Sequence, residues 1–344
     1  ESMTANLTEE RRKSSRYFEY DDIFNHVKSF GSYQQKVAYG TCVMLIGQGL
    51  QFGHLVFVTG SPKFKCSTPN VTCGGINKCC TNCTSYEFDT MFATIVSEWN
   101  LICDRAPLAA IIQSMFFVGM LVGSFVSGIL SDAFGRKTVI FGTIAVMATC
   151  GIAQSFVQTS IPLFAALRFG IGAFMISATL AQFILMMEVI GPGYRARIGN
   201  VNGFYWLAGA CIQVTIAYFI RDWRTFSWVT SAPAFILYLF FRVYPESPRW
   251  FVVKGKLKPA HKIIMKYGGK DNKSCDPEQV MTMLTAIHDD QVLRNTTGKR
   301  FTTSLINFAI MIHASQLPGN VYVITVAQST TMALFIFPTW FSMN

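Results

Sequence analysis

Long apolar blocks, uncharged except for Arg168, are separated by charged connections and dominate the chain. Six of them lie before residue 245, at 37–58, 107–130, 138–158, 161–187, 198–220 and 225–241. As helices that rise about 1.5 Å per residue, these blocks can cross roughly 30 Å of hydrocarbon. A further uncharged tract begins at Phe301 and is interrupted at Pro318 and Gly319, so 321–344 is expected to be a seventh span. The pattern predicts an all-α multi-span membrane protein.

Composition supports a membrane class over a soluble one. Of the 344 residues, 51% are hydrophobic and 14% are charged, whereas about a quarter of the residues of soluble domains are charged. The net charge of +10 would favour nucleic-acid binding in a soluble protein, but the cations lie mainly in the connections between apolar blocks. We therefore expect the lipid bilayer as a partner and no nucleic acid.

The distribution of Lys and Arg predicts the orientation. Six lie in residues 1–36, two after the second block, two after the fourth and twelve after the sixth, against six in the opposite connections. Because Lys and Arg accumulate on the cytoplasmic side, we expect the amino terminus in the cytoplasm. The predicted organisation is a cytoplasmic amino terminus (1–36), a first span (37–58), an extracellular loop (59–106), spans two to six (107–244), a cytoplasmic loop with helices at 259–267 and 277–288 (245–303), and a partial seventh-span region (304–344).

Cysteines support this topology independently. Six of the ten cysteines crowd into the loop 59–106, namely Cys66, Cys73, Cys79, Cys80, Cys83 and Cys103. The same loop contains glycosylation sequons at Asn70 and Asn82, so an oxidising compartment and disulfides are expected. Zinc is the alternative, but the loop has no histidine, and we expect no metal site. Six cysteines allow about 15 pairings, and these stay open.

Motifs of soluble enzymes are missing from the sequence. Gly268-Gly269-Lys270 lacks the spacing of a phosphate loop, and there is no HExxH segment. We therefore expect no enzymatic activity and no cofactor. His54, near the outer end of the first block, is expected to be a hydrogen-bonded polar residue rather than a proton relay.

A charged motif follows the second block, where residues 128–137 read GILSDAFGRK. Asp132 lies at the carboxyl end of the expected helix, where the helix dipole disfavours an anion, so it needs a cationic partner. Arg136 is the nearest candidate. Gly128 and the pair Gly119 and Gly123 favour close approach of another helix.

This segment resembles the GxxxDxxGR[RK] signature of the major facilitator superfamily. YDDI at 20–23, SEWNLIC at 97–103 and PESPRW at 245–250, together with the cysteine-rich loop, are similar to the organic cation, organic anion and carnitine transporter family. Sugar porters share the PESPRW-type segment but not the loop, so they are the second choice. The resemblance covers about residues 17–300.

The resemblance implies a major facilitator fold with twelve spans in two halves, of which this chain holds the amino-terminal six-helix half and a truncated second half. The missing carboxyl-terminal half is then a required partner. Charged residues at the cytoplasmic span ends are implied to act in gating, with Asp132, Arg136 and Lys137 as a latch, Glu188 and Arg195 as a second charge pair, and Glu246 and Arg249 as a third. The complete gating set is Gly128, Asp132, Gly135, Arg136, Lys137, Arg168, Glu188, Arg195, Glu246 and Arg249.

The implied function is alternating-access transport of organic ions across the plasma membrane, either facilitative or secondary active. The substrate is a cation, a carnitine-like zwitterion or an anion. Alternatives are a sugar-porter-like transporter, a non-transporting half-length fragment or regulatory isoform, and a seven-span receptor or channel.

Substrate contacts are expected from aromatic faces and a few polar groups, since cation–π contact and apolar burial bind large organic ions. The candidates are Phe52, Gln182, Phe183, Tyr205, Trp206 and Gln213. Mid-membrane positions of the first six spans carry no Asp or Glu, and only Arg168 could favour an anion. Arg168 is expected about two turns inside the membrane, where it needs an interior partner or water. Ile176 and Thr179 stand where cation-transporting members tend to carry Lys and Trp.

Overall fold

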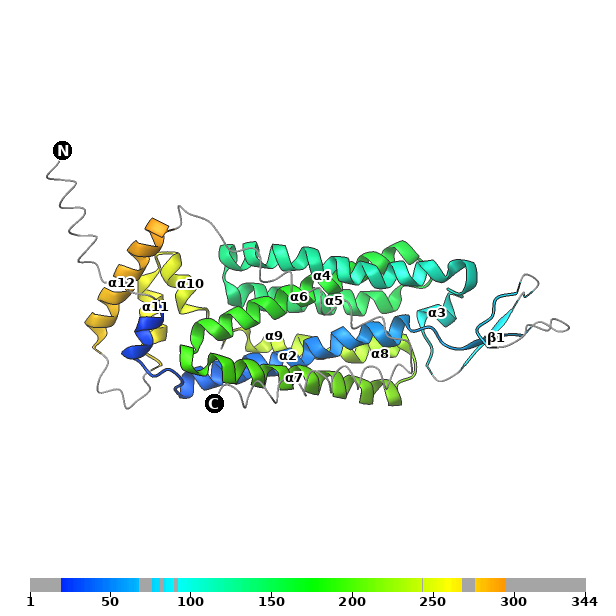
Figure 1. Ribbon diagram of the computed structural model, residues 1–344, viewed down its shortest axis with the longest axis horizontal. Coiled ribbons are helices and arrows are strands. Elements are labelled where there is room, and N and C mark those ends of the chain that lie inside the picture. The colour runs from blue at the N-terminus through cyan, green and yellow to red at the C-terminus, as the bar shows by residue number, and fades with distance from the viewer. Residues whose placement is uncertain are drawn as a thin grey trace, which may run out of the picture.

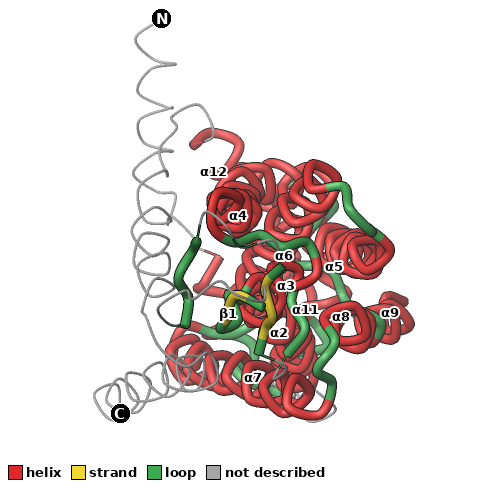
Figure 2. Tube along the Cα trace, turned by 90° about the vertical axis from the view of Figure 1, so that its right-hand side faces the viewer, coloured by secondary structure: helices red, strands yellow, loops and turns green. Residues whose placement is uncertain are grey.

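Long helices run side by side through the computed structural model, which describes residues 20–67, 76–80, 83, 85–89, 92–242, 244–267 and 276–294. Short helices cover one end of the bundle, and a small region that contains β1 extends from the other (Figure 1). The long helices are α2 (Ser32–Thr59), α4 (Ala106–Phe134), α5 (Arg136–Ala153), α6 (Ile161–Val189) and α7 (Pro192–Phe219). Seen along the bundle, α4, α5 and α6 group on one side and α2 and α7 on the other (Figure 2).

Within the described residues, four helical segments are long and apolar enough to cross a membrane: Ser32–Thr59, Cys103–Phe134, Arg136–Phe156 and Ile161–Val189. They coincide with the first four predicted spans. The fifth predicted span is α7, whose 28 residues are sufficient in length. It is more polar than the others because Asn200, Asn202 and Gln213 lie within it.

The sixth predicted span is interrupted. Residues 225–241 were expected to form one helix, but the structure has α8 (Trp223–Ser231), α9 (Pro233–Tyr238) and a 3-10 turn, η4 (Leu239–Arg242). Pro233 has no N–H to donate to the preceding turn, so the helical hydrogen-bond ladder stops there. Backbone bonding resumes with the Phe235 N–H, which donates to the Ala232 carbonyl at 3.1 Å.

Glycines set the close contact between α4 and α6. A Cβ atom on Gly119 would lie 2.1 Å from the Phe169 carbonyl oxygen, and one on Gly123 would lie 2.2 Å from the Ala173 oxygen. The predicted role of this glycine pair is confirmed. A Cβ atom on Gly128, by contrast, would meet nothing within 4 Å, so among the described residues no other helix lies close to it, and its expected role in close helix approach stays a prediction.

A helical cap covers one end of the bundle, which we call the cap end. It consists of α10 (Pro248–Val253), α11 (Leu257–Ile264), α12 (Pro277–Arg294) and the 3-10 helix η1 (Tyr20–Asn25). Buried side chains from all four elements, including Ile23, Val252, Ile264 and Leu284, share one apolar core. The two helices expected at 259–267 and 277–288 correspond to α11 and α12, while α10 was not predicted.

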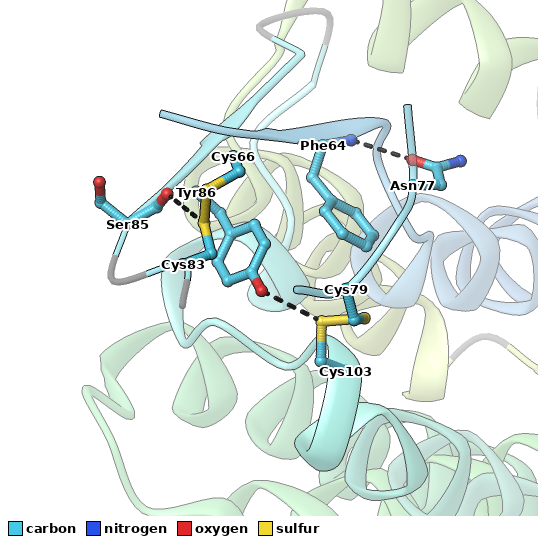
Figure 3. Close-up of a disulfide and its surroundings, with 8 residues drawn as sticks. All are labelled: Phe64, Cys66, Asn77, Cys79, Cys83, Ser85, Tyr86 and Cys103. Atoms are coloured by element: carbon cyan, nitrogen blue, oxygen red, sulfur yellow. Dashed lines mark hydrogen bonds between the residues drawn. A yellow bond between two sulfur atoms is a disulfide. The ribbon is translucent and has the colours of Figure 1, made fainter. Parts of the chain in front are cut away.

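The opposite end, which we call the disulfide end, contains β1 (Phe64–Cys66) and β2 (Tyr86–Phe88) in antiparallel pairing, then α3 (Ile95–Glu98) and η2 (Cys103–Arg105). Disulfides join Cys66 to Cys83 and Cys79 to Cys103 (Figure 3). Cys80 is also disulfide-bonded. Cys73, Asn70 and Asn82 lie outside the described residues, as does the expected seventh span.

Candidate functional site

Three helix ends meet around Arg136 at the cap end. Its Nη1 lies 2.9 Å from an Asp132 carboxylate oxygen and donates to the Ser131 carbonyl at 2.9 Å. The other edge of the guanidinium faces Glu188, with Nε at 3.2 Å and Nη2 at 3.3 Å from its two oxygens. Arg136 therefore joins the carboxyl ends of α4 and α6 to the start of α5. The Glu188 side chain is 9% exposed and that of Asp132 is 74% exposed.

Glu246 caps the amino end of α5 from the cap side. The Lys137 N–H donates to both carboxylate oxygens of Glu246, at 3.1 and 3.2 Å. An anion at a helix amino terminus is stabilised by the free N–H groups and the helix dipole. Burial raises the pKa of Glu246, while these hydrogen bonds from backbone N–H groups oppose that rise.

Gly135 makes this arrangement possible. It has φ +96°, in the region that favours glycine, and a Cβ atom there would lie 2.3 Å from a Glu246 oxygen. The Trp250 ring N–H donates to the Asp132 carbonyl at 3.0 Å, which fixes α10 against the same turn. Gly135, Glu246 and Trp250 therefore belong to one contact, which joins the turn between α4 and α5 to α10 and the residues just before it.

A second ion pair lies nearby. Arg195 donates to both oxygens of Asp21, at 2.8 and 2.6 Å, and its Nε donates to the Met187 and Ile190 carbonyls at the end of α6. The hydrogen bond from Arg195 lowers the pKa of Asp21. The pair ties η1 to the turn between α6 and α7.

Two of the expected charge pairs are different in the structure. Glu188 contacts Arg136 rather than Arg195, because Arg195 turns toward Asp21. Glu246 binds backbone N–H groups of α5, and Arg249 lies over the Tyr20 ring with 5.6 Å to the centroid. The predicted partner of Asp132, Arg136, is confirmed.

A stripe of polar residues runs along α2 toward the disulfide end. Gln48 donates to Gln182 of α6 at 2.8 Å and accepts from Thr179 at 2.8 Å. Gln51 donates to Ser231 of α8 at 2.9 Å. Three residues further on, His54 is 2.8 Å from the Ser227 hydroxyl. These contacts hold α2 against α6 and α8 through hydrogen bonds inside apolar packing.

Arg168 ends this polar stripe and is fully buried. Its Nη1 lies 3.2 Å from Nδ1 of His54, and its guanidinium is 5.2 Å from the Phe164 ring centroid. His54 stacks on Phe226 with 5.2 Å between ring centroids. The expected interior partner of Arg168 is therefore His54, and the expectation that His54 is a hydrogen-bonded polar residue is confirmed.

Family comparison decides the class of protein. The model of the sugar (and other) transporter family matches residues 41–337, which is most of the chain. The chain belongs to this family. It is therefore a multi-pass membrane protein of a transporter family.

Within this family, the chain is similar to proteins named as organic cation and organic cation/carnitine transporters. The chain is 27% identical to an organic cation transporter protein of Drosophila melanogaster over 303 residues, covering 77% of this chain and 55% of that protein. It is 28% identical to the mouse organic cation/carnitine transporter 2 over 298 residues, covering 72% of this chain and 53% of that protein. The chain thus spans about half the length of the curated relatives it matches.

Solved structures support the predicted fold. The proton:xylose symporter XylE, a major facilitator superfamily protein, aligns with a TM-score of 0.62 and 16% identity, covering 90% of this chain and 69% of that chain. At this identity the likeness concerns the fold. It confirms the expectation of a major facilitator fold for this chain.

The structure brings some of the substrate candidates together. The rings of Phe52 and Trp206 lie 5.6 Å apart, between α2 and α7. Gln213 is fully buried against Gly53, one residue from Phe52. Gln182 lies across α2, bonded to Gln48.

Two candidates lie apart from that group. The Phe183 side chain is 44% exposed on α6. Tyr205 packs near the cap end in a cluster with Ala38, Cys42 and Met186.

Of the polar stripe, His54 was predicted to be hydrogen-bonded, whereas Gln48, Gln51 and their partners on α8 were not predicted. The Gln48, Gln51 and His54 stripe has a spacing of three, which places successive side chains near one face of a helix and was available as a signal. Ser227 and Ser231, four apart on α8, match it. Asp21 carried no comparable local signal, because its partner Arg195 is distant in sequence.

Proposed function

We propose that the protein to which this chain belongs transports organic ions across the plasma membrane by alternating access. The observation that carries the proposal is the Arg136 cluster, in which one guanidinium joins Asp132 of α4 to Glu188 of α6. A gate of this kind has to open and close, so its charges must be able to exchange partners. The mostly exposed Asp132 carboxylate fits that requirement, whereas Glu188 is shielded.

The face around Asp132 supports contact with a second half. On α4, Ile129 is 72% exposed, and Val122 and Val126 are also exposed. An apolar helix face next to an exposed carboxylate suits a helix that brings apolar side chains and a cation or an amino terminus. We propose that the latch formed by Asp132, Arg136 and Lys137 closes this end when the other end is open.

The orientation follows from charge and cysteines together. The cap end carries the basic segments and is proposed to be cytoplasmic, with the amino terminus on the same side. The disulfide end, with Cys66–Cys83 and Cys79–Cys103, is proposed to be extracellular. Glycosylation at Asn70 and Asn82 belongs to the same proposal.

Substrate contacts are proposed on the aromatic pair Phe52 and Trp206, with Gln213 and Gln182 as polar groups. The amide of Gln213 and the Nε2 of Gln182 have no hydrogen-bond partner among the described residues. Uncharged donors beside aromatic rings suit large, weakly hydrated organic ions. A cation driven by membrane potential gains about 2.3 kcal/mol per charge at 100 mV, which drives accumulation without ATP.

Uptake by cells that produce the native-length protein tests this proposal. Four probes of similar size are compared, namely an organic cation, a zwitterion, an organic anion and a neutral hexose. We expect saturable uptake of at least one organic ion and no uptake of the hexose. Uptake of the hexose alone would support a sugar-porter-like function instead. No uptake of any probe, with the protein present at the cell surface, would contradict transport.

The length of the native product separates transport from a regulatory role. An antibody to the 245–299 segment measures its size in membranes after removal of glycans. Because the chain spans about half of its curated relatives, a product well above 38.4 kDa is expected. A product near 38.4 kDa would favour a half-length protein that associates with a longer relative, which co-purification would then show.

A further inference from the structure

Arg168 holds a buried positive charge that its surroundings leave incompletely paired. The side chain is fully buried, about 10 Å from the start of α6 at ~1.5 Å per residue. Its single described hydrogen bond joins Nη1 to His54, and its Nε and Nη2 have no hydrogen-bond partner among the described residues. No acidic side chain in the described part of the chain forms an ion pair with it. A charge in this environment is costly unless an opposite charge balances it.

His54 cannot supply that opposite charge. The Ser227 hydroxyl donates its one proton to the Trp223 carbonyl at 2.7 Å, so it accepts from Nε2 of His54. Nδ1 of His54 then accepts from Arg168, which requires a neutral imidazole. Gln154 also donates to the Ser227 oxygen, at 3.4 Å, and strengthens this direction of bonding. His54 is thus a neutral support that fixes the orientation of the guanidinium.

The unpaired edge of Arg168 has a specific shape. Nε–H and one N–H of Nη2 are parallel and form the fork that binds both oxygens of a carboxylate. The same edge of Arg136, in the same chain, faces the two oxygens of Glu188 at 3.2 and 3.3 Å. Because Nη1 of Arg168 is occupied by His54, the fork is the remaining edge.

We propose that Arg168, positioned by His54, binds the carboxylate group of the transported substrate. This inference rests on the proposed transport function and narrows its substrate class to zwitterions and organic anions. The Phe164 ring beneath the guanidinium and the stacked Phe226 exclude water from the site and strengthen the charge interaction. Because Arg168 is fully buried in this structure, carboxylate binding requires a state in which α2, α6 and α8 open around it at the disulfide end.

The proposal is tested by measuring how tightly the purified native-length protein, in lipid nanodiscs, binds two matched ligands. Glycine betaine has a carboxylate and a trimethylammonium group, while choline has the same cation with a hydroxyl in place of the carboxylate. Ligand-induced thermal stabilisation is measured over a concentration series, together with benzoate as an anion and chloride as a small inorganic anion. A ligand that binds the folded state stabilises it in proportion to its affinity.

We expect a carboxylate ligand to bind the wild-type chain at least about tenfold more tightly than choline and chloride. Arg168→Gln removes this preference, and Arg168→Lys, which keeps the charge but lacks the fork, restores it only in part. His54→Ala weakens carboxylate binding through lost positioning. Arg221→Gln, at an exposed arginine on the same end, leaves it unchanged.

Three results would overturn the carboxylate site. These are equal affinity for glycine betaine and choline, preference for chloride over every carboxylate, and a full carboxylate preference in Arg168→Gln. Folding of each variant is checked by its elution volume and helical content, and a variant that fails this check is replaced by Arg168→Met. Binding of choline alone would leave organic-cation transport standing while removing the carboxylate site.

Discussion

Arg136 and Arg168 are placed in opposite electrostatic situations within one bundle. Arg136, at the cap end, has Asp132 on one side and Glu188 on the other. Arg168, toward the disulfide end, has a neutral histidine on one side and no described partner on its carboxylate-binding edge. The first charge is balanced by the chain itself and serves contact between helices. The second is not, which is why we assign it to a ligand.

The largest expected loss of stability comes from removing the charge of Arg136, which Asp132 and Glu188 balance. Arg136→Gln leaves the shielded Glu188 without its cation and releases the ends of α4 and α6. Removal of one partner from a buried ion pair costs about 3–5 kcal/mol, so thermal stability of the purified chain should fall strongly. Asp132→Asn is the matched control, because an exposed pair contributes only about 0–1 kcal/mol. Equal losses of thermal stability in the two variants would contradict the conclusion that the Arg136–Glu188 pair is buried and the Arg136–Asp132 pair is exposed.

A change in stability of the opposite sign is expected when Arg168 is replaced. Arg168→Met removes an incompletely paired buried charge and keeps apolar volume, so we expect the free energy of unfolding to stay equal or to rise. Thermal unfolding in a buffer without carboxylates measures the change. A loss as large as that of Arg136→Gln would show that the chain itself balances Arg168. Added carboxylate ligand should reduce the difference between wild type and Arg168→Met.

A smaller effect is expected at Gly135. The residue has φ +96°, and an added Cβ would lie 2.3 Å from a Glu246 oxygen, so Gly135→Ala strains the turn and displaces the cap of α5. Backbone strain of this type costs about 1–3 kcal/mol. Gly128→Ala, at a glycine with open space around it, is the control and should be neutral or slightly stabilising, as thermal unfolding would show. Similar losses at both positions would refute this explanation.

The smallest expected effects are two pH dependences of opposite sign at the cap end. Arg195 lowers the pKa of Asp21, so the stability from this group is present above the ordinary value of 3.8 and is lost as the pH falls below it. Burial raises the pKa of Glu246, so its contribution is full below 4.5 and is lost as the pH rises through the folded-state pKa.

The difference in stability between wild type and variant, measured from about pH 3 to pH 7, checks both signs. The difference for Asp21→Asn should shrink on acidification, and that for Glu246→Gln should shrink as the pH rises. Parallel profiles for the two variants would contradict the opposite pKa directions.

Local sequence was sufficient for most of the helices and for one ion pair. Apolar blocks predicted α2, α4, α5 and α6, because an apolar stretch of this length with at most one charge has few alternatives to a membrane helix. Asp132 and Arg136 are four residues apart across one turn, so their pairing was predictable. Pro233 can break a helix, but because it lies inside an apolar block, the block 225–241 was predicted as one continuous span.

Partners distant along the chain could not be assigned from the sequence. Glu188 and Arg195 are close in sequence, yet packing directs Glu188 to Arg136 and Arg195 to Asp21. The contact of Arg168 with His54 likewise depends on how α6 lies against α2. The short strands β1 and β2 were missed because each alternates over three residues only, and because their pairing joins segments that are separated by a loop.

Uptake by Asp132→Asn in the native-length protein tests the central claim most directly. The substitution removes one charge of the proposed latch with little expected loss of stability, and Asp104→Asn at the disulfide end is the matched control. We predict that Asp132→Asn lowers organic-ion uptake while its amount at the cell surface stays equal to that of wild type. Unchanged uptake at equal surface amount would contradict a gating role for the Arg136 cluster.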